Sequence, residues 1–154
     1  MNAHQDSTFL YTDPPSCLGL WWALEECTED NGCLFVVPGS HKAGVSRTFR
    51  RTEGGAPDAP LTEFHPAEAP PLDVEGAVPL LASPGDLVLL HGAVVHYSHP
   101  NTSAASRHAY SVHVVDSGEG VAYPASNWLQ RPPGMPFRDL LSTDPEGPPL
   151  APAA

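Results

Sequence analysis

Apolar residues occur in short runs along this chain, and turn-forming residues separate the runs. Three runs lie in the first part, at residues 4–11, 18–24 and 33–37. Asp13-Pro14-Pro15 ends the first run, because proline cannot donate to a sheet ladder, and Asn31-Gly32 is a hairpin signal before the third. The pattern predicts three strands in this part of the chain.

The same pattern returns after residue 75. Further apolar runs lie at residues 78–81, 87–91, 94–98 and 107–115, again with turn-forming residues between them. Seven short strands with almost no helix indicate an all-β fold, either a sandwich or a jelly roll. Folds of this kind often enclose a ligand pocket.

Two segments lack this alternation. In residues 38–75, a basic cluster precedes a stretch rich in glycine, proline and acidic residues, so we expect a long surface loop, either a functional lid or a variable insertion. Residues 132–154 are rich in proline, and we expect a disordered tail after about residue 143. Residues 1–131 would then form the folded domain.

Composition narrows the classes of function. The 154 residues suffice for one domain, and 7 basic against 18 acidic residues give a net charge of −11, which excludes a general nucleic-acid binder. No apolar run reaches the ~20 residues of a membrane span. Cys17, Cys27 and Cys33 are odd in number and lack metal-finger spacing, which favours a reducing compartment. We therefore expect a cytoplasmic monomer with no membrane span.

Candidate metal ligands lie at the start of the chain. His4 and Asp6 are two residues apart, so on a strand their side chains would point to the same face. An imidazole and a carboxylate together with one distant histidine form the set that suits Fe(II) and leaves positions open for O₂ and a co-substrate. His91 and His96 both lie on later predicted strands and are candidates for the distant ligand.

An isolated arginine follows these histidines. Arg107 is the only arginine between Arg51 and Arg131, and it opens the last predicted strand in an acidic protein. A guanidinium group holds a carboxylate through two parallel hydrogen bonds. Arg107 is therefore a candidate anchor for a dicarboxylate ligand.

Several motifs together resemble those of one enzyme family. They are His4-Gln5-Asp6, the block Leu18-Gly19-Leu20-Trp21-Trp22, Asn31-Gly32-Cys33 with Pro38-Gly39-Ser40-His41, His91-Gly92 through His96, and Arg107-His108-Ala109-Tyr110-Ser111. In order and spacing they resemble the phytanoyl-CoA dioxygenase family over roughly residues 3 to 131. Members of that family are Fe(II)- and 2-oxoglutarate-dependent oxygenases with a cupin-like double-stranded β-helix.

The resemblance implies a role for each matching residue. It makes His4, Asp6 and His96 the iron ligands, places Arg107 and Ser98 on the distal carboxylate of 2-oxoglutarate, and puts Trp21 against the co-substrate. Family members carry a long portion before the first ligand, whereas His4 is the fourth residue here. We therefore expect residues 1–131 to be the C-terminal portion of such a domain, and thus a partial β-helix.

The expected function is that of a dioxygenase that hydroxylates an unactivated C–H bond of a small organic or acyl substrate and releases succinate and CO₂. Two alternatives remain open from the residues. One is a cupin-like metalloprotein that does not use 2-oxoglutarate, and the other is a non-catalytic remnant of the β-helix. His113 would share a face with Arg107 and so could line the pocket, but we expect a packed core histidine. For His41 and His99 we expect turn positions.

Overall fold

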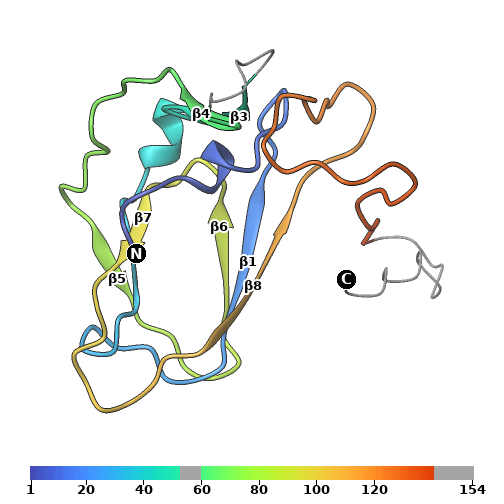
Figure 1. Ribbon diagram of the computed structural model, residues 1–154. Coiled ribbons are helices and arrows are strands. Elements are labelled where there is room, and N and C mark those ends of the chain that lie inside the picture. The colour runs from blue at the N-terminus through green and yellow to red at the C-terminus, as the bar shows by residue number, and fades with distance from the viewer. Residues whose placement is uncertain (53–59, 141–154) are drawn as a thin grey trace.

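A computed structural model describes residues 1–52 and 60–140 (Figure 1). Two three-stranded antiparallel sheets make up most of the fold. One has the strand order β6-β1-β8, where β1 is Leu18–Ala23, β6 is Leu87–His91 and β8 is Ala109–Val114. The other has the order β5-β2-β7, where β2 is Leu34–Val36, β5 is Val78–Leu80 and β7 is His96–Ser98.

The core lies between these sheets. Trp21 of β1, Leu34 of β2 and Leu90 of β6 are buried together, so inward-facing residues of both sheets meet in one cluster. Four small buried residues complete the cluster: Ala23 of β1, and Cys27, Cys33 and Ala82 from the connections. This arrangement agrees with the predicted all-β, double-stranded β-helix architecture, and its two sheets form the walls on either side of the site described below (Figure 1).

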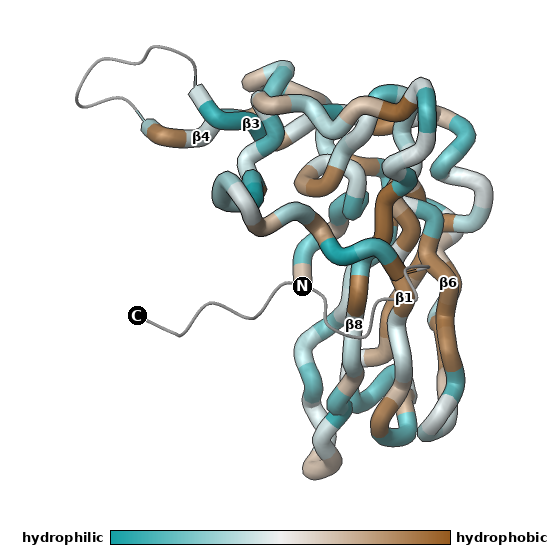
Figure 2. Tube along the Cα trace, turned by 90° about the vertical axis from the view of Figure 1, so that its right-hand side faces the viewer, coloured by the Kyte–Doolittle hydropathy of each residue, from teal (hydrophilic) through white to brown (hydrophobic). Residues whose placement is uncertain are grey.

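The β6-β1-β8 sheet has an outer face, turned away from the core, that is apolar and partly exposed. Leu20 on β1 pairs with Leu89 on β6, and Trp22 pairs with Tyr110 on β8. Leu89 and Tyr110 are 60% and 59% exposed, and Figure 2 shows hydrophobic residues along β6 and β1. The adjacent residues Trp21 and Trp22 therefore face opposite ways, into the core and onto the outer face.

Six of the seven predicted strands are confirmed, with both ends within two residues of the predicted bounds, and the first predicted strand is wrong. Only His4 forms a bridge there, with His96, and residues Asp6–Thr8 form a 3-10 helix, η1. The backbone turns because the carbonyl of Asp6 accepts hydrogen bonds from the amides of Phe9 and Leu10. A local turn thus replaces the sheet ladder at this point.

The expectation of an unstructured loop at residues 38–75 is also wrong in part. Residues Ser40–Ala43 form a second 3-10 helix, η2, and β3 (Thr48–Arg51) pairs with β4 (Thr62–His65). Phe49 and Phe64 are direct cross-strand partners with ring centroids 4.9 Å apart, and both pack on Phe9. Aromatic contact with the start of the chain thus stabilises a hairpin whose residues 53–59 lie outside the described structure.

Residues 132–140 contain neither helix nor strand, and the predicted tail after residue 143 lies outside the described residues. Nowhere in residues 1–52 and 60–140 is there a helix with the length and apolar character needed to cross a membrane.

Candidate metal centre

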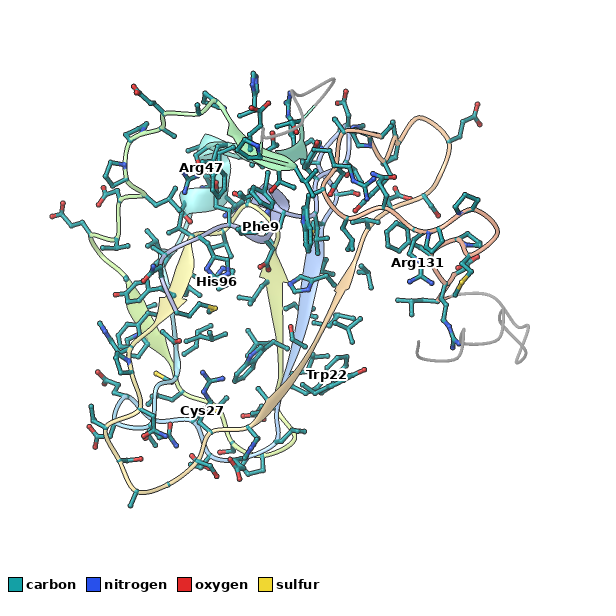
Figure 3. The ribbon with its side chains drawn as sticks, in the orientation of Figure 1. Phe9, Trp22, Cys27, Arg47, His96 and Arg131 are labelled. Carbon is teal, nitrogen blue, oxygen red and sulfur yellow. The ribbon has the colours of Figure 1, made fainter. Side chains whose placement is uncertain are left out.

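Two side chains near the start of the chain, His4 and Asp6, meet His96 of β7 between the two sheets. Nε2 of His4 lies 3.7 Å and Nε2 of His96 lies 3.6 Å from Oδ1 of Asp6, and the two imidazole rings are 4.2 Å apart. All three could contribute one ligand atom to a single metal ion. Figure 3 shows His96 pointing into the space between the sheets.

Backbone hydrogen bonds hold these residues together. The amides of His4 and His96 each donate to the carbonyl of the other at 3.0 Å, so the start of the chain is fixed to β7. The amide of Ser7 donates to the carbonyl of Gly92 at 2.8 Å. The spacing predicts that His4 and Asp6 share one face of a strand. Instead, the 3-10 turn brings Asp6 back towards His4, and the two side chains meet in this way.

Both histidines present a free Nε2 to the carboxylate. Nδ1 of His4 lies 2.8 Å from the carbonyl oxygen of Asn2, and Nδ1 of His96 lies 3.1 Å from that of Val94. A carbonyl oxygen can only accept, so each Nδ1 carries a proton, and Nε2 is then the nitrogen of each ring through which the neutral imidazole can bind a metal. A second hydrogen bond of this kind is what orients histidines that bind metal ions. The three residues therefore fit a divalent metal.

Burial and charge set the protonation states at the site. Burial lowers the pKa of His96 more than the nearby Asp6 raises it, so His96 is held neutral at neutral pH. Burial raises the pKa of Asp6, but the contact with His113 and the charges of His96, His113 and His4 together outweigh burial and hold that pKa below its usual value. A neutral imidazole and an ionised carboxylate are the forms that bind metal.

A fourth polar side chain touches the other carboxylate oxygen. Nε2 of His113 on β8 lies 3.2 Å from Oδ2 of Asp6, and this contact raises the pKa of His113. Within residues 1–52 and 60–140, however, no hydrogen bond of standard geometry reaches Oδ2, although the atom is buried. The expectation of a packed core histidine is wrong, because His113 is exposed on β8 and lines the cavity. The contact arises because His113 lies directly opposite Gly19, whose lack of a side chain lets Asp6 come close.

The residues predicted to bind the co-substrate line the same cavity. It has a volume of about 240 Å³. Trp21, Ser98 and Arg107 lie on its wall together with His4, Asp6 and His96. The structure therefore brings together all six residues singled out from the sequence, and it adds His113 to them.

Arg107 has a buried polar atom without a partner. No hydrogen bond within the described part of the chain reaches its Nε, and the guanidinium carbon lies 5.7 Å from the centre of the Trp21 ring. Buried donors are nearly always satisfied, and a guanidinium group is best satisfied by a carboxylate. The cavity beside Arg107 is therefore the place where an acidic ligand would be bound.

Glu25 fixes the segment that carries this arginine. One carboxylate oxygen of Glu25 accepts a hydrogen bond from Ser106 Oγ at 2.8 Å, and the other accepts one from the amide of His108 at 2.7 Å. These hydrogen bonds lower the pKa of Glu25. Since Ser106 and His108 flank Arg107, the carboxylate holds the backbone on both sides of it, a role that no sequence motif indicated.

The remaining candidates are not part of the site. His91 is exposed at the end of β6, where its Nδ1 accepts a hydrogen bond from the amide of Ala93, so His96 is the distant histidine at the centre. Gln5 is buried and points away from Asp6, with its amide bonded to Gly44, Ala93 and Ser46. A larger cavity of about 410 Å³ lies on that side, but its lining contains no histidine, cysteine or arginine.

Comparison with known proteins agrees with this geometry. The family model described as phytanoyl-CoA dioxygenase (PhyH) matches residues 1–109 of the chain. The chain belongs to this family. It is 52% identical over 129 residues to "Phytanoyl-CoA dioxygenase 1" of Oryza sativa subsp. japonica, an alignment that covers 83% of this chain and 43% of that protein.

A second relative is "Phytanoyl-CoA dioxygenase domain-containing protein 1" of Danio rerio, which is 45% identical over 140 residues, 90% of this chain and 47% of that protein. The chain thus spans about half the length of the curated relatives it matches. The part of the chain that the family model matches contains His4, Asp6, His96 and Arg107.

Solved structures show the same fold. EvdO2 from Micromonospora carbonacea var. aurantiaca, complexed with 2-oxoglutarate, superimposes with a TM-score of 0.53 at 23% identity, over 85% of this chain and 49% of that one. The non-heme alpha ketoglutarate dependent carbocyclase SnoK from nogalamycin biosynthesis gives a TM-score of 0.50 at 28% identity, over 74% of this chain and 42% of that one. The sheets described above are therefore part of a double-stranded β-helix.

Proposed function

We propose that this PhyH-family chain carries the catalytic site of an Fe(II)- and 2-oxoglutarate-dependent dioxygenase. The reaction would hydroxylate an unactivated C–H bond of a small organic or acyl substrate, with O₂ as oxidant and release of succinate and CO₂. One observation supports this above all others. Two imidazoles and a carboxylate lie in the same 240 Å³ cavity as a guanidinium group whose buried Nε has no hydrogen-bond partner in the described part of the chain.

The proposed roles follow from the positions of the side chains. His4, Asp6 and His96 would hold Fe(II), which when bound supplies the chemistry that couples O₂ activation to decarboxylation of the co-substrate. Arg107 would bind the distal carboxylate of 2-oxoglutarate through its guanidinium fork, and the hydroxyl of Ser98 would donate to the same carboxylate. Ser98 is buried on β7, two residues after His96 and on the same face of that strand.

Apolar walls would keep bulk water away from these groups. Trp21, Leu34 and Leu90 are all buried and line the cavity between the ligands and Arg107. In such surroundings the attraction between a guanidinium group and a carboxylate is stronger than in water. The ring of Trp21 would lie along the co-substrate, as the resemblance to the family implied.

The substrate side of the site offers aromatic rather than basic surface. The ring of Phe9 lies 6.4 Å from that of His4 and packs against the β3–β4 hairpin. The three arginines of this region already have partners. Arg47 lies over the Phe64 ring at 4.0 Å, Nε of Arg50 donates to Thr48 Oγ1, and Nε of Arg51 donates to the carbonyl of Trp128. This environment favours a small organic or acyl group over the phosphates of a nucleotide-bearing substrate.

Anaerobic titration with Fe(II) and 2-oxoglutarate would test the proposal. We expect a weak visible absorption band from the metal-bound co-substrate, and we expect slow succinate release once air is admitted. His96→Ala should abolish both, whereas His65→Ala, which removes an exposed histidine of β4, should leave both unchanged. A folded wild-type chain that binds Fe(II) without the band would favour a metalloprotein that does not use 2-oxoglutarate. A folded chain that binds no metal would favour a non-catalytic module.

A further inference from the structure

The two oxygens of the Asp6 carboxylate have different surroundings. Oδ1 faces the free Nε2 atoms of His4 and His96, at 3.7 and 3.6 Å. Oδ2 points the other way, towards β8, where Nε2 of His113 is 3.2 Å away. A metal ion held with both histidines would therefore meet Oδ1, while Oδ2 would meet His113.

Strand register creates the space in which this second contact forms. Gly19 of β1 pairs with His113 on one side and with Leu90 on the other. A Cβ atom at position 19 would lie 3.1 Å from Oδ2 of Asp6 and 3.6 Å from Cδ2 of His113. The absence of a side chain at Gly19 thus lets the carboxylate lie over β1 and reach the histidine on the next strand.

We propose that His113 is a positioning residue that donates its Nε2 proton to Oδ2 of Asp6 and so keeps Asp6 a ligand through Oδ1 alone. This inference rests on the proposed metal site. Oδ2 is buried and lacks an aligned donor in the described structure, and a carboxylate oxygen left in that state is unfavourable. Hydrogen bonds at such sites are often long or bent before the ligand binds and shorten when it does.

The consequence concerns the number of positions that remain open on the metal. A carboxylate that binds through both oxygens occupies two positions, one of which the 2-oxoglutarate chelate or O₂ needs. A donor fixed on Oδ2 competes with the metal for that oxygen. His113 would thus preserve three open positions without itself touching metal or co-substrate.

Two variants of His113 test this, with Co(II) as the probe because its visible spectrum reports coordination and it is stable in air. His113→Ala should bind Co(II) about 10–100-fold more weakly, the usual effect of losing a partner of a metal ligand. His113→Gln should restore affinity to within about threefold, because its amide can donate to Oδ2. His65→Ala, which removes an exposed histidine outside the site, should match the wild type.

The spectrum and the midpoint of thermal unfolding separate positioning from packing. If His113→Ala retains the wild-type affinity and visible spectrum, the proposal is overturned. It is also overturned if His113→Gln is as weak as His113→Ala while both unfold within a few degrees of the wild type without metal. If His113→Ala does not fold, the comparison of His113→Gln with the wild type decides.

A measurement without metal keeps this inference distinct from the proposed function. Nitrogen NMR of the metal-free chain should show that Nε2 of His113 carries a proton and that its resonance shifts in Asp6→Asn. A His113 protonated only at Nδ1 could not donate to Oδ2, which would overturn the inference even if the chain binds metal. If the wild type binds no Co(II) but Nε2 is protonated and shifts, the proposed function fails and the contact between His113 and Asp6 stands.

Discussion

Gly19 of β1 lies directly opposite His113 of β8, and the space above Gly19 is occupied by the carboxylate of Asp6. A residue without a side chain, to which the sequence analysis assigned no role, thus determines how close the ligand can come to the sheet. The family block Leu18-Gly19-Leu20-Trp21 therefore has two roles, because Gly19 admits Asp6 and Trp21 lines the cavity.

Gly19→Ala should weaken metal binding more than it weakens the fold. The added methyl would press on Asp6 Oδ2 at 3.1 Å and on Leu90 Cβ at 3.3 Å, so the carboxylate must shift by a few tenths of an ångström. We expect Co(II) affinity to fall about 10–100-fold, with a change of only about 1 kcal/mol in the unfolding free energy of the metal-free chain. Co(II) affinity within about threefold of the wild type, measured by metal titration beside urea unfolding, would contradict this.

Arg107→Leu should impair co-substrate binding and leave metal binding intact. A hydrogen-bonded charge pair contributes about 1.5–3 kcal/mol, so we expect 2-oxoglutarate to bind roughly 10–150-fold more weakly. Titration of the visible band under anaerobic conditions measures this, with Co(II) affinity as the parallel readout. Arg131→Leu is the matched control, because its Nε bonds only the carbonyl of Met135 in the proline-rich segment. Unchanged 2-oxoglutarate affinity in Arg107→Leu would remove the carboxylate anchor from the proposal.

Glu25 should make stability depend on pH in the acid range. Its pKa in the folded state lies below the ordinary value of 4.5, so its carboxylate stabilises the fold at pH values above 4.5. That stabilisation is lost as pH falls through the lowered pKa, where the folded state takes up the proton. Urea unfolding between pH 6 and pH 3 should show a smaller decrease for Glu25→Gln than for the wild type, and parallel curves would refute the assignment.

The thiols should be unreactive in the folded chain. Cys17, Cys27 and Cys33 are buried and free, and burial raises the pKa of Cys17 to about 12. Since the thiolate is the reactive form, we expect a chromogenic disulfide reagent at pH 8 to label the native protein far more slowly than the denatured protein. Rapid labelling of all three thiols without denaturant would show that the core between the sheets is open.

Gly92→Ala should destabilise the whole fold. A Cβ at this position would lie 2.6 Å from the carbonyl oxygen of Cys17, a backbone atom that cannot move alone. Overpacking of this kind costs about 1–3 kcal/mol, which urea unfolding can measure. Gly118→Ala is the matched control, because its Cβ would meet only the exposed carboxylate of Asp116. Similar unfolding midpoints for both variants would contradict the close contact.

The sequence was sufficient to predict most strands and the six residues expected to bind metal and co-substrate, but not the contact of His113 with Asp6. Short apolar runs between turn residues predict six of the strands, because burial against a facing sheet requires that pattern wherever the strands pair. His4, Asp6, His96 and Arg107 stand out since they are rare polar groups in or beside such runs. Their chemistry, two imidazoles, a carboxylate and a guanidinium group, can be recognised without coordinates.

Tertiary structure alone decided how these residues meet. The strand predicted at residues 4–11 is a turn, because the Asp6 carbonyl and the bridge between His4 and His96 satisfy the backbone in place of a ladder. The β3–β4 hairpin forms where only a loop was expected, through contacts of Phe49 and Phe64 with Phe9. The contact of His113 with Asp6 depends on the register of β1 and β8, which local sequence does not specify because cross-strand partners lie far apart in the chain.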